Sequence, residues 1–369
     1  MGTIKRTFAN SLTGTGKLSA TNLDSNIPAA NIADASVTNV TTLPEALGQA
    51  IKSVAGSPPS QAVGDIWYNS VTGTLKNYVT VAAAWASSGN LNTARQQIVG
   101  TGTESAGLIA GGLASTGTTG ASEEYNGSSW TNGGTMGTGR RIGGFSGTQT
   151  AAFFAGGFVP PATNATEEYN GSSWAGGGNL PSTRAASGAA GTLTAGVMFG
   201  GYTGGPPYDG IATTNEYDGS TWTAGGNLNT SRNNPGGDGI QTAALAFAGN
   251  DAPGGAIGVT ESYDGSTWTT SPATLGTSRY SFSSSKAGST SAAFAFGGLA
   301  TGGGSLSASE KYDGTSWTAD ASITTARGYA AGFGTTSSAV IAGGSTPTYS
   351  NATEEYTDAF NATRTVTTS

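Results

Sequence analysis

A tryptophan recurs along most of this chain at a nearly constant interval, and no other feature limits the possible folds so strongly. Six of the seven tryptophans are spaced 44 to 49 residues apart: Trp85, Trp130, Trp174, Trp222, Trp268 and Trp317. An internal repeat of this length is typical of solenoids, propellers and other arrays of one small unit. We therefore expect copies of one supersecondary unit that pack against one another.

Other residues recur in phase with the tryptophan. A Tyr followed by Asn-Gly or Asp-Gly lies just before five of the six, as in Tyr125-Asn126-Gly127 before Trp130. An apolar run ending in Gly-Gly precedes the Tyr, although the fourth unit keeps only Gly249. An arginine follows each tryptophan by ten or eleven positions: Arg95, Arg140 or Arg141, Arg184, Arg232, Arg279 and Arg327.

The pattern within each unit predicts four short strands. The first begins near the Arg, the second is the apolar run, the third carries the Tyr, and the fourth begins at the Trp. Asn-Gly and Asp-Gly favour a tight hairpin between the third and fourth strands, because both residues tolerate positive φ. Four antiparallel strands repeated radially make a β-propeller blade, so we predict an all-β fold.

The number of blades follows from how the strands divide among the units. Six sets of three strands begin at the six arginines, but the last set, which ends at Tyr356, has a degenerate fourth strand. A fourth strand without a set begins at Trp85. Joining the two removes sheet edges, so we predict a six-bladed propeller over residues 85–369, closed by the Trp85 strand. Seven blades are the alternative, if residues 65–69 and 75–79 form extra strands.

The combination of these features resembles the Kelch family. That family's blade pattern is an apolar run into Gly-Gly, then Glu-x-Tyr-Asp, then Trp, then Arg, and the resemblance covers about residues 85–360. It implies four-stranded, Kelch-like propeller blades. The units here are richer in Gly, Ala, Ser and Thr than is usual in that family, and the fourth lacks the Gly pair.

The first part of the chain is different. Residues 1–60 contain one aromatic residue, Phe8, and none of the repeat. Residues 43–54 are the one plausible helix, with Leu43, Leu47, Ala50, Ile51 and Val54 on one face. Residues 56–59 have the composition of a linker, and 61–84 are predicted as a β-hairpin leading into the propeller. A segment so poor in apolar residues either stays disordered or folds against a partner.

Composition excludes several classes of function. The chain has no Cys and no His, so disulfides, Cys- or His-ligated metals and His-dependent catalysis are impossible. A net charge of -7 argues against nucleic-acid binding. No apolar run is long enough for a transmembrane helix. The adjacent Glu pairs point to opposite faces of a strand and cannot flank one glycosidic bond. We expect no enzyme, no catalytic residues, no cofactor, no metal site and no membrane insertion.

The in-phase residues are expected to be structural. The residue two before each Tyr is Glu123, Glu167, Asn215, Glu261, Glu310 or Glu354. Buried carboxylates need a donor, and Arg is the usual bidentate one, so these residues and the repeated arginines are expected to make the same hydrogen bonds in each unit. The repeated Trp and Tyr side chains are expected to be wedges between blades.

Binding residues are expected where the repeat varies, which is in the loops between the second and third strands, called here the 2–3 loops. In an up-and-down blade all of them emerge on one face. Exposed aromatics beside Asp and Asn suit a sugar-binding surface. The candidates are Phe158, Tyr202, Tyr208, Asp209, Asn250, Asp251 and Tyr349. Ordinary surface loops are the alternative.

Three stretches look like virion proteins of tailed bacteriophages, especially those of marine cyanobacteria: residues 1–10, 27–32 and 64–69. The resemblance implies a tail-fibre-like structural protein, assembled in the host cytoplasm and located in the virion. Residues 1–60 would anchor it to other virion proteins, as a homo-oligomer, and the propeller would attach to a glycan or protein of the host surface. The alternatives are an architectural neck, tail or capsid decoration protein, and a cellular Kelch scaffold that binds peptides.

Overall fold

The computed structural model describes residues 52–251 and 255–366, and within them the chain forms strands and no helix. The strands make eight sheets, seven with four strands and one with three. They belong to two compact units. The larger is Ala83–Asp358, and the smaller combines the described residues up to Ala82 with those from Ala359 onward. The predicted all-β class is confirmed.

Six four-stranded antiparallel sheets lie in the larger unit, and we call them repeat sheets 1 to 6 in chain order. Sheet 1 contains β6 (Val99–Thr103), β7 (Ala106–Ala110), β10 (Ala121–Tyr125) and β11 (Trp130–Thr135). Sheet 2 contains β12 (Gly144–Thr148), β13 (Ala151–Ala155), β14 (Thr166–Tyr169) and β15 (Trp174–Gly176). Sheet 3 contains β16 (Gly188–Thr192), β17 (Ala195–Phe199), β18 (Thr214–Tyr217) and β19 (Trp222–Ala224).

The other three follow the same order. Sheet 4 contains β20 (Gly236–Ile240), β21 (Ala243–Phe247), β22 (Val259–Tyr263) and β23 (Trp268–Thr274). Sheet 5 contains β24 (Ser283–Ser284), β25 (Ala293–Phe296), β26 (Ser309–Tyr312) and β27 (Trp317–Asp320). Sheet 6 contains β28 (Ala331–Gly334), β29 (Ser338–Ala342), β30 (Thr353–Thr357) and β4 (Ala84–Ser88). The predicted sequence of four strands per unit is therefore present in each.

The turn between the third and fourth strands is the predicted tight hairpin. In sheet 1, Oδ1 of Asn126 accepts hydrogen bonds from the backbone N–H groups of Ser128 (3.0 Å) and Ser129 (2.9 Å). Gly127 has a φ of 91°, a backbone conformation that would be strained in any residue with a side chain. The side chain of the first turn residue thus replaces backbone partners, and Gly supplies the left-handed position.

The strand that begins at Trp85 completes the last repeat sheet, as the sequence predicted. β4 pairs antiparallel with β30, and Trp85 lies opposite Tyr356. The chain therefore enters and leaves the larger unit through neighbouring strands. This pairing gives sheet 6 the fourth strand that its own part of the repeat lacks.

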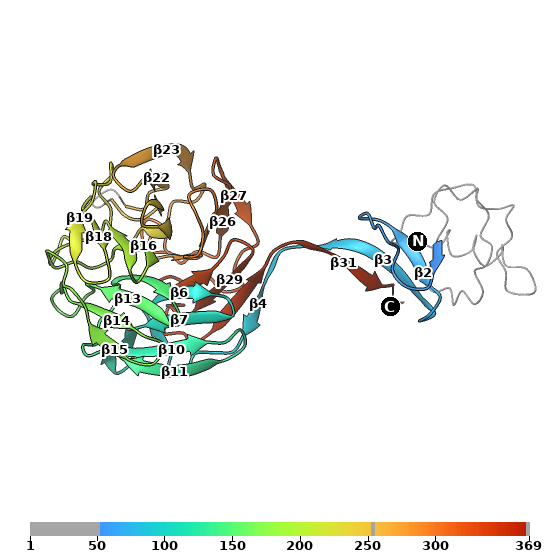
Figure 1. Ribbon diagram of the computed structural model, residues 1–369, viewed down its shortest axis with the longest axis horizontal. Helices are drawn as coiled ribbons and strands as arrows, with labels where there is room; N and C mark the ends of the chain where they lie inside the picture. The colour runs from blue at the N-terminus through green and yellow to red at the C-terminus, as the bar shows by residue number, and fades with distance from the viewer. Residues whose placement is uncertain (1–51, 252–254, 367–369) are drawn as a thin grey trace, which may run out of the picture. The chain divides into compact units, whose positions relative to one another are not determined.

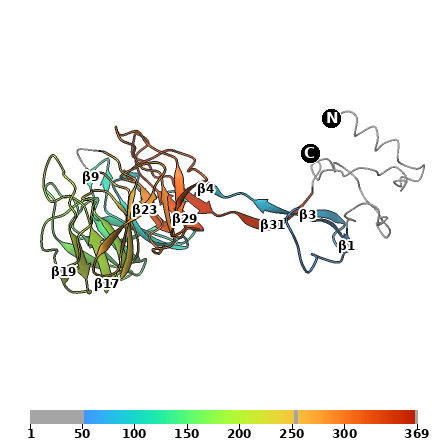
Figure 2. The ribbon, with the colours of Figure 1, turned by 90° about the horizontal axis from the view of Figure 1, so that it is seen from above.

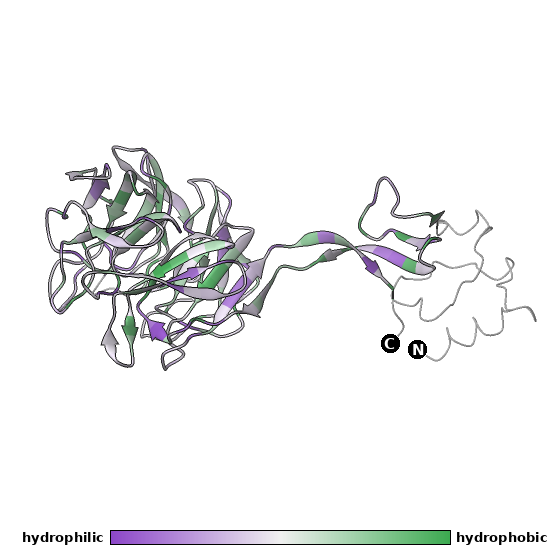
Figure 3. Ribbon diagram, turned by 60° about the horizontal axis from the view of Figure 1, so that its bottom comes forward, coloured by the Kyte–Doolittle hydropathy of each residue, from purple (hydrophilic) through white to green (hydrophobic). Residues whose placement is uncertain are grey.

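The repeat sheets follow one another in a closed series. The first strand β6 contacts β12, β12 contacts β16, and the contacts continue through β20, β24 and β28 back to β6. In Figure 1 the fourth strands β11, β15, β19, β23, β27 and β4 lie at the rim. Hydrophobic residues of this unit are concentrated in its strands (Figure 3). The arrangement is consistent with a β-propeller.

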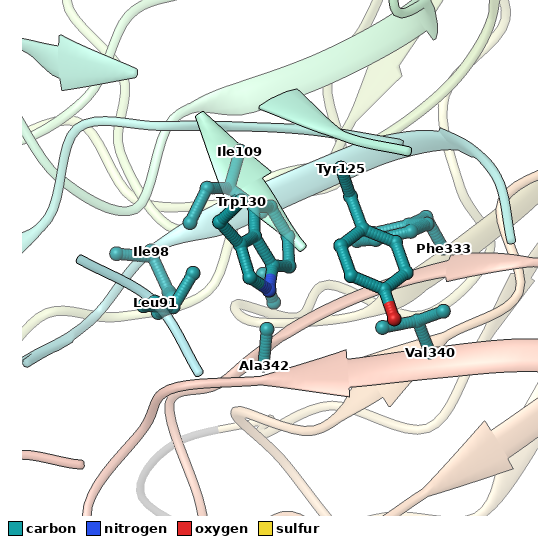
Figure 4. Close-up of a cluster of buried hydrophobic side chains, with 9 residues drawn as sticks. Leu91, Ile98, Ile109, Tyr125, Trp130, Phe333, Val340 and Ala342 are labelled. Atoms are coloured by element: carbon teal, nitrogen blue, oxygen red, sulfur yellow. The ribbon is translucent and has the colours of Figure 1, made fainter. Parts of the chain in front are cut away.

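Buried apolar side chains fill the space between each neighbouring pair of sheets. Six such clusters are present in the described residues, and one of them joins sheet 6 to sheet 1. In that cluster Tyr125 and Trp130 of sheet 1 pack against Phe333 and Val340 of sheet 6 (Figure 4). The rings of Trp130 and Phe333 meet edge-on at 6.0 Å. The repeated aromatics are thus wedges between sheets.

Two of the eight sheets were not predicted, so the total differs from six. One is the three-stranded sheet of β5 (Arg95–Gln96), β8 (Leu113–Ala114) and β9 (Gly117–Thr118). Its strands β8 and β9 lie in the first 2–3 loop of the larger unit, and β5 lies just before β6. The other belongs to the smaller unit and contains β1 (Lys52–Val54), β2 (Ile66–Asn69), β3 (Thr74–Val81) and β31 (Phe360–Thr365).

The smaller unit corrects three expectations. β2 and β3 form a hairpin, but β3 also pairs along its length with β31, visible side by side in Figures 1 and 2, so the residues from Ala359 onward are not part of the larger unit. The two strands of the seven-blade alternative exist, but in this separate unit. The predicted helix is wrong at Lys52–Val54, which pair in parallel with β2. A neighbouring strand satisfies hydrogen bonds that so short a helix holds only marginally. Residues 1–51 of the predicted anchor lie outside the described residues.

Replacing Trp85 tests how firmly β4 closes the series. Its indole packs on Phe294, Phe296 and Tyr356, so Trp85→Ala is expected to lower the free energy of unfolding by about 3–5 kcal/mol. Denaturant unfolding of the full chain measures this. Ile240→Ala, at a side chain that is 56% exposed, is the control and should cost little. A loss below about 1 kcal/mol for Trp85→Ala would show that β4 is only loosely attached.

Candidate functional site

Six buried arginines fix the face of the larger unit that carries the 2–3 loops. We call them the clamp arginines: Arg95, Arg140, Arg184, Arg232, Arg279 and Arg327. Each reaches the residue two before the Tyr of its own unit, as in Arg95 to Glu123 (2.7 Å) and Arg279 to Glu310 (2.5 Å). In the second unit, where the sequence left two candidates, Arg140 makes the contact (3.0 Å to Glu167).

The clamp joins three separate segments. A second guanidinium nitrogen donates to the backbone carbonyl that begins the third strand, for example from Arg232 to Val259 (2.8 Å). The other carboxylate oxygen accepts from a backbone N–H three residues before the arginine, as in Asn229 to Glu261 (2.7 Å). The start of the first strand, the 2–3 loop and the third strand are thereby held together. Because these charges are buried, breaking one pair is expected to be costly.

The third unit departs from this pattern in two linked positions. Arg184 reaches Oδ1 of Asn215 (2.7 Å) where the other units have Glu. The residue three before Arg184 is Pro181, which has no N–H to donate to a second carboxylate oxygen. Asn215 has an amide nitrogen in place of the second carboxylate oxygen, and this nitrogen donates to the carbonyl of Thr223 (3.3 Å). With no carboxylate to offset burial, the pKa of Arg184 is lowered to about 10.

A second set of contacts runs between sheets through the glutamate that lies just before four of the repeated tyrosines. The hydroxyl of Tyr263 donates to Glu216 of the preceding sheet (2.6 Å), and Tyr169 and Tyr217 make the corresponding contacts to Glu124 and Glu168. Burial, followed by the Glu124 contact, raises the pKa of Tyr169 to about 12. The adjacent glutamates thus have separate structural partners, one within its sheet and one in the next.

The 2–3 loops are held over the beginning of the first strands by a repeated backbone pairing. In each unit the residue after the clamp arginine pairs with the first residue beyond the Gly-Gly position. The pairs are Gln96 with Leu113, Arg141 with Phe158, Ala185 with Tyr202, Asn233 with Asn250, Tyr280 with Leu299, and Gly328 with Ser345. The sheet of β5, β8 and β9 is the most extended example. Each candidate loop is therefore placed beside a clamp.

A ring of six residues, with backbone hydrogen bonds at five of its six junctions, lies just beyond the clamps. The residue two after each clamp arginine has positive φ, between 47° and 58°: Gln97, Ile142, Ala186, Asn234, Ser281 and Tyr329. Five backbone hydrogen bonds join these six residues, among them Gln97 N–H to the Tyr329 carbonyl (2.8 Å) and Ala186 N–H to the Ile142 carbonyl (2.6 Å). A left-handed backbone conformation is strained at non-Gly residues, and here the backbone hydrogen bonds between neighbouring units stabilise it.

Three of the predicted binding residues come together beside this ring. Tyr202 packs in one cluster with Phe158, and its ring meets Tyr208 edge-on at 4.9 Å. The guanidinium of Arg141 lies over Phe158, 4.9 Å from the ring centre. Burial and the neighbouring Tyr208 raise the pKa of Tyr202 to about 12, and Arg141 opposes the shift. Tyr208 is 38% exposed, so the cluster has a solvent-facing aromatic edge.

The other candidates are placed around or apart from this cluster. Asn250 pairs with Asn233, whose side chain donates to the carbonyl of Tyr208 (2.9 Å). Asp209 is exposed and follows Tyr208, and Oδ1 of Asp251 is buried. Tyr349 is 37% exposed and pairs with Ser345 in the sixth unit. No contact in the described residues joins Tyr349 to the cluster.

The sequence reasoning missed Arg141, Tyr280 and Tyr329 as residues of this face. Arg141 is the extra arginine of the second unit, and the arginine repeat could have identified it. Tyr280 and Tyr329 follow a clamp arginine by one and two positions, and Tyr280 is among the groups that raise the pKa of Tyr329, after burial. The position after the clamp is the signal that would have found them.

A cavity of about 80 Å³ lies where the six first strands meet. Every unit contributes residues to it, at two to five positions after its clamp arginine, such as Gln97, Phe145 and Gly332. The strands approach closely here. A Cβ on Gly332 would lie 2.6 Å from Cβ of Ser283, and one on Gly237 would lie 2.6 Å from the Ala189 carbonyl oxygen. Glycine at these positions therefore lets the first strands approach closely around the cavity, which we call the channel.

Lys286 and Asp238 are the charged groups next to this cavity. Lys286 lines it, and its Nζ donates to the Ala189 carbonyl at 3.4 Å. Asp238 is fully buried and accepts from Ser285 Oγ and the Gly288 N–H, both at 2.7 Å. Burial raises the pKa of Asp238 to about 6, against the effects of Ser285, Gly288 and Lys286. Burial lowers the pKa of Lys286, against the effect of Asp238.

Comparison with known proteins adds no assignment: no family model matches the chain, and no curated protein is significantly similar to it. In the described part of the chain no helix is long and apolar enough to cross a membrane. Within the same residues no three His, Cys, Asp or Glu side chains are grouped so as to hold a metal. The loop face and the channel are therefore the features on which a function can be argued.

Restoring the missing carboxylate in the third unit tests the clamp. Asn215→Glu is expected to lower the free energy of unfolding by about 1–3 kcal/mol, because one carboxylate oxygen stays unsatisfied beside Pro181. Pro181→Gly supplies the N–H, so the double variant should recover most of that loss. Denaturant unfolding of the two single variants and the double variant gives the coupling energy. Additive effects would contradict this account of the pairing.

Asp238 predicts a specific pH dependence of stability. Its pKa is raised from 3.8 to about 6, so the folded protein keeps the proton longer than the unfolded chain. Stability should therefore fall as pH rises from about 4 to 6, by roughly 3 kcal/mol in total, and Asp238→Asn should remove that fall. Unfolding measured from pH 4 to 7 checks this, with exposed Asp209→Asn as the control. Parallel curves for the wild type and Asp238→Asn would refute it.

Proposed function

We propose that this chain is a glycan-binding attachment protein and that its 2–3 loop face is the binding surface. The supporting observation is the cluster of Phe158, Tyr202, Tyr208 and Arg141, with a half-exposed aromatic edge beside the ring of backbone hydrogen bonds. Aromatic faces with neighbouring amides and carboxylates suit sugar rings, which offer apolar C–H faces and hydroxyl groups. Asn250 and Asp209 lie next to these aromatics in the loops. Tyr349 would make a separate subsite.

We further propose that the larger unit is a six-bladed, Kelch-like propeller. The six repeat sheets, the closed series of first strands and the cluster between sheets 6 and 1 support six blades and closure. The family name rests on the sequence resemblance. A rigid propeller would keep the loops in fixed positions, which lowers the entropy cost of binding.

The place of the protein on a phage particle rests on the sequence resemblance of residues 1–10, 27–32 and 64–69. One structural feature agrees with it. Both ends of the larger unit lead into the same smaller unit, where β3 pairs with β31. A domain carried by both of its ends on one base is suited to display away from a particle. Other virion proteins would then be partners of residues 1–60.

Substitution of Tyr208 tests the glycan proposal. Removing its half-exposed ring from the full chain should weaken glycan binding about tenfold, since a lost stacking contact is worth roughly 1.4 kcal/mol. Binding is measured on a glycan array and by titration with the best sugar. Ile240→Ala is the matched control, because Ile240 is an exposed apolar residue that ends β20 at the opposite end of the strands.

The outcomes separate the alternatives. Binding that Tyr208→Ala weakens and Ile240→Ala preserves supports the proposal. Equal effects of both variants, or no sugar bound, would contradict it. Cryo-electron microscopy of particles that contain the chain then distinguishes attachment from architecture, because loops covered by other virion proteins would exclude host recognition by this face.

A further inference from the structure

The fifth unit breaks the repeat at one position, and the residue there lines the channel. Five units have Gly seven residues after the clamp arginine, always with positive φ: Gly102, Gly147, Gly191, Gly239 and Gly334. The fifth unit has Lys286 there, with a φ of 65°. A lysine in left-handed backbone is strained, and such strain is found where function requires it. Its first strand, β24, is also reduced to two residues.

Lys286 lines the cavity although its position in the unit differs from that of the other lining residues. The other lining residues lie two to five positions after their clamp arginines, whereas Lys286 lies seven after. Its Nζ reaches Ala189, which is five positions after Arg184. Successive residues advance along a strand by about 3.3 Å, so the amine lies level with the deepest of the other lining residues. Lys286 is thus the one lining residue in the described part of the chain that lies more than five positions after its clamp arginine.

The amine has capacity for another acceptor. It can donate three hydrogen bonds, and in the described residues it makes one, at the long distance of 3.4 Å. No carboxylate oxygen of those residues lies within 4.0 Å of it, because Asp238 is turned toward Ser285 Oγ and the Gly288 N–H. Toward the ring, Oε1 of Gln97 is buried without a hydrogen-bond partner. The Gln97 oxygen is an acceptor and needs a donor, so the cationic donor of the cavity that is left for an anion is the Lys286 amine.

We infer that the channel is a site for a carboxylate group, bound to Nζ of Lys286. The cavity of about 80 Å³ suits a small planar anion, and charge-assisted hydrogen bonds to an amine are the strong kind. The carboxylate belongs either to a free small acid or to an acidic sugar held on the loop face. The second source rests on the proposed glycan binding, and the anion site itself does not.

Acetate titration of the full chain tests the site. The protein has six lysines, so labelling with ¹³Cε-lysine gives few signals, and that of Lys286 is the one lost in Lys286→Gly. Gly is the residue that the backbone of the other five units has at this position, so this variant should fold. Acetate should move the Lys286 signal saturably, while the signal of half-buried Lys76 in the smaller unit moves no more than with chloride at equal ionic strength.

Thermal unfolding gives the comparison between variants. Saturating acetate should raise the Tm of the wild type by about 2 °C or more over chloride. Lys286→Gly and Lys286→Gln should lose this difference, and Lys76→Gln should keep it. An unsaturable shift shared by all lysines, or an acetate effect that survives in both Lys286 variants, would overturn the inference.

Glucuronate and glucose distinguish the two sources. A saturable shift of the Lys286 signal with glucuronate but not glucose assigns the site to an acidic sugar. A response to acetate alone assigns it to a free small acid. If acetate binds while no glycan binds the loop face, the anion site stands and the proposed attachment function fails.

Discussion

The buried pairing of each clamp arginine with its acceptor is the interaction on which the larger unit depends. A guanidinium that loses its hydration needs several acceptors, and each clamp finds them in segments distant in the sequence. Satisfying one side chain therefore fixes the start of the first strand, the 2–3 loop and the third strand relative to one another. The third unit shows how strict this requirement is, since the loss of one backbone donor at Pro181 coincides with the loss of the carboxylate at residue 215.

The apolar clusters and the clamps have different tasks. The clusters hold neighbouring sheets together. Their mixture of Ala, Phe, Tyr and Trp side chains packs well, and such packing tolerates apolar substitutions of similar volume. The clamps act inside one unit and are directional. Together they explain how a chain with 61 glycines and only 10% charged residues has a defined interior. Few charges are present, and many of them are buried with a specific partner.

The regular part of this architecture could be predicted from the sequence, because the same residue pattern recurs in each unit. The tryptophan interval and the unpaired strand at Trp85 predicted the sheets and the closing pair. The pairing of β3 with β31 could not be predicted, since neither strand belongs to the repeat and their partners are nearly the whole chain apart. The candidate loop residues were found by their variability, but their grouping depends on Arg141 and on backbone pairing that side-chain patterns do not record. Lys286 was not among the predicted site residues, because it is unusual only in comparison with the five glycines at the equivalent positions.

The pairing of β4 with β30 has a consequence for how the protein is made. β4 is among the first residues of the larger unit to leave the ribosome, and its partner β30 is among the last. Until then Trp85 and the face of sheet 1 that packs on sheet 6 have no partner to cover them. Contacts between residues so far apart in sequence form slowly. The nascent chain is thus exposed to misassociation while the larger unit is synthesised, and its tolerance of that interval is a property on which selection can act.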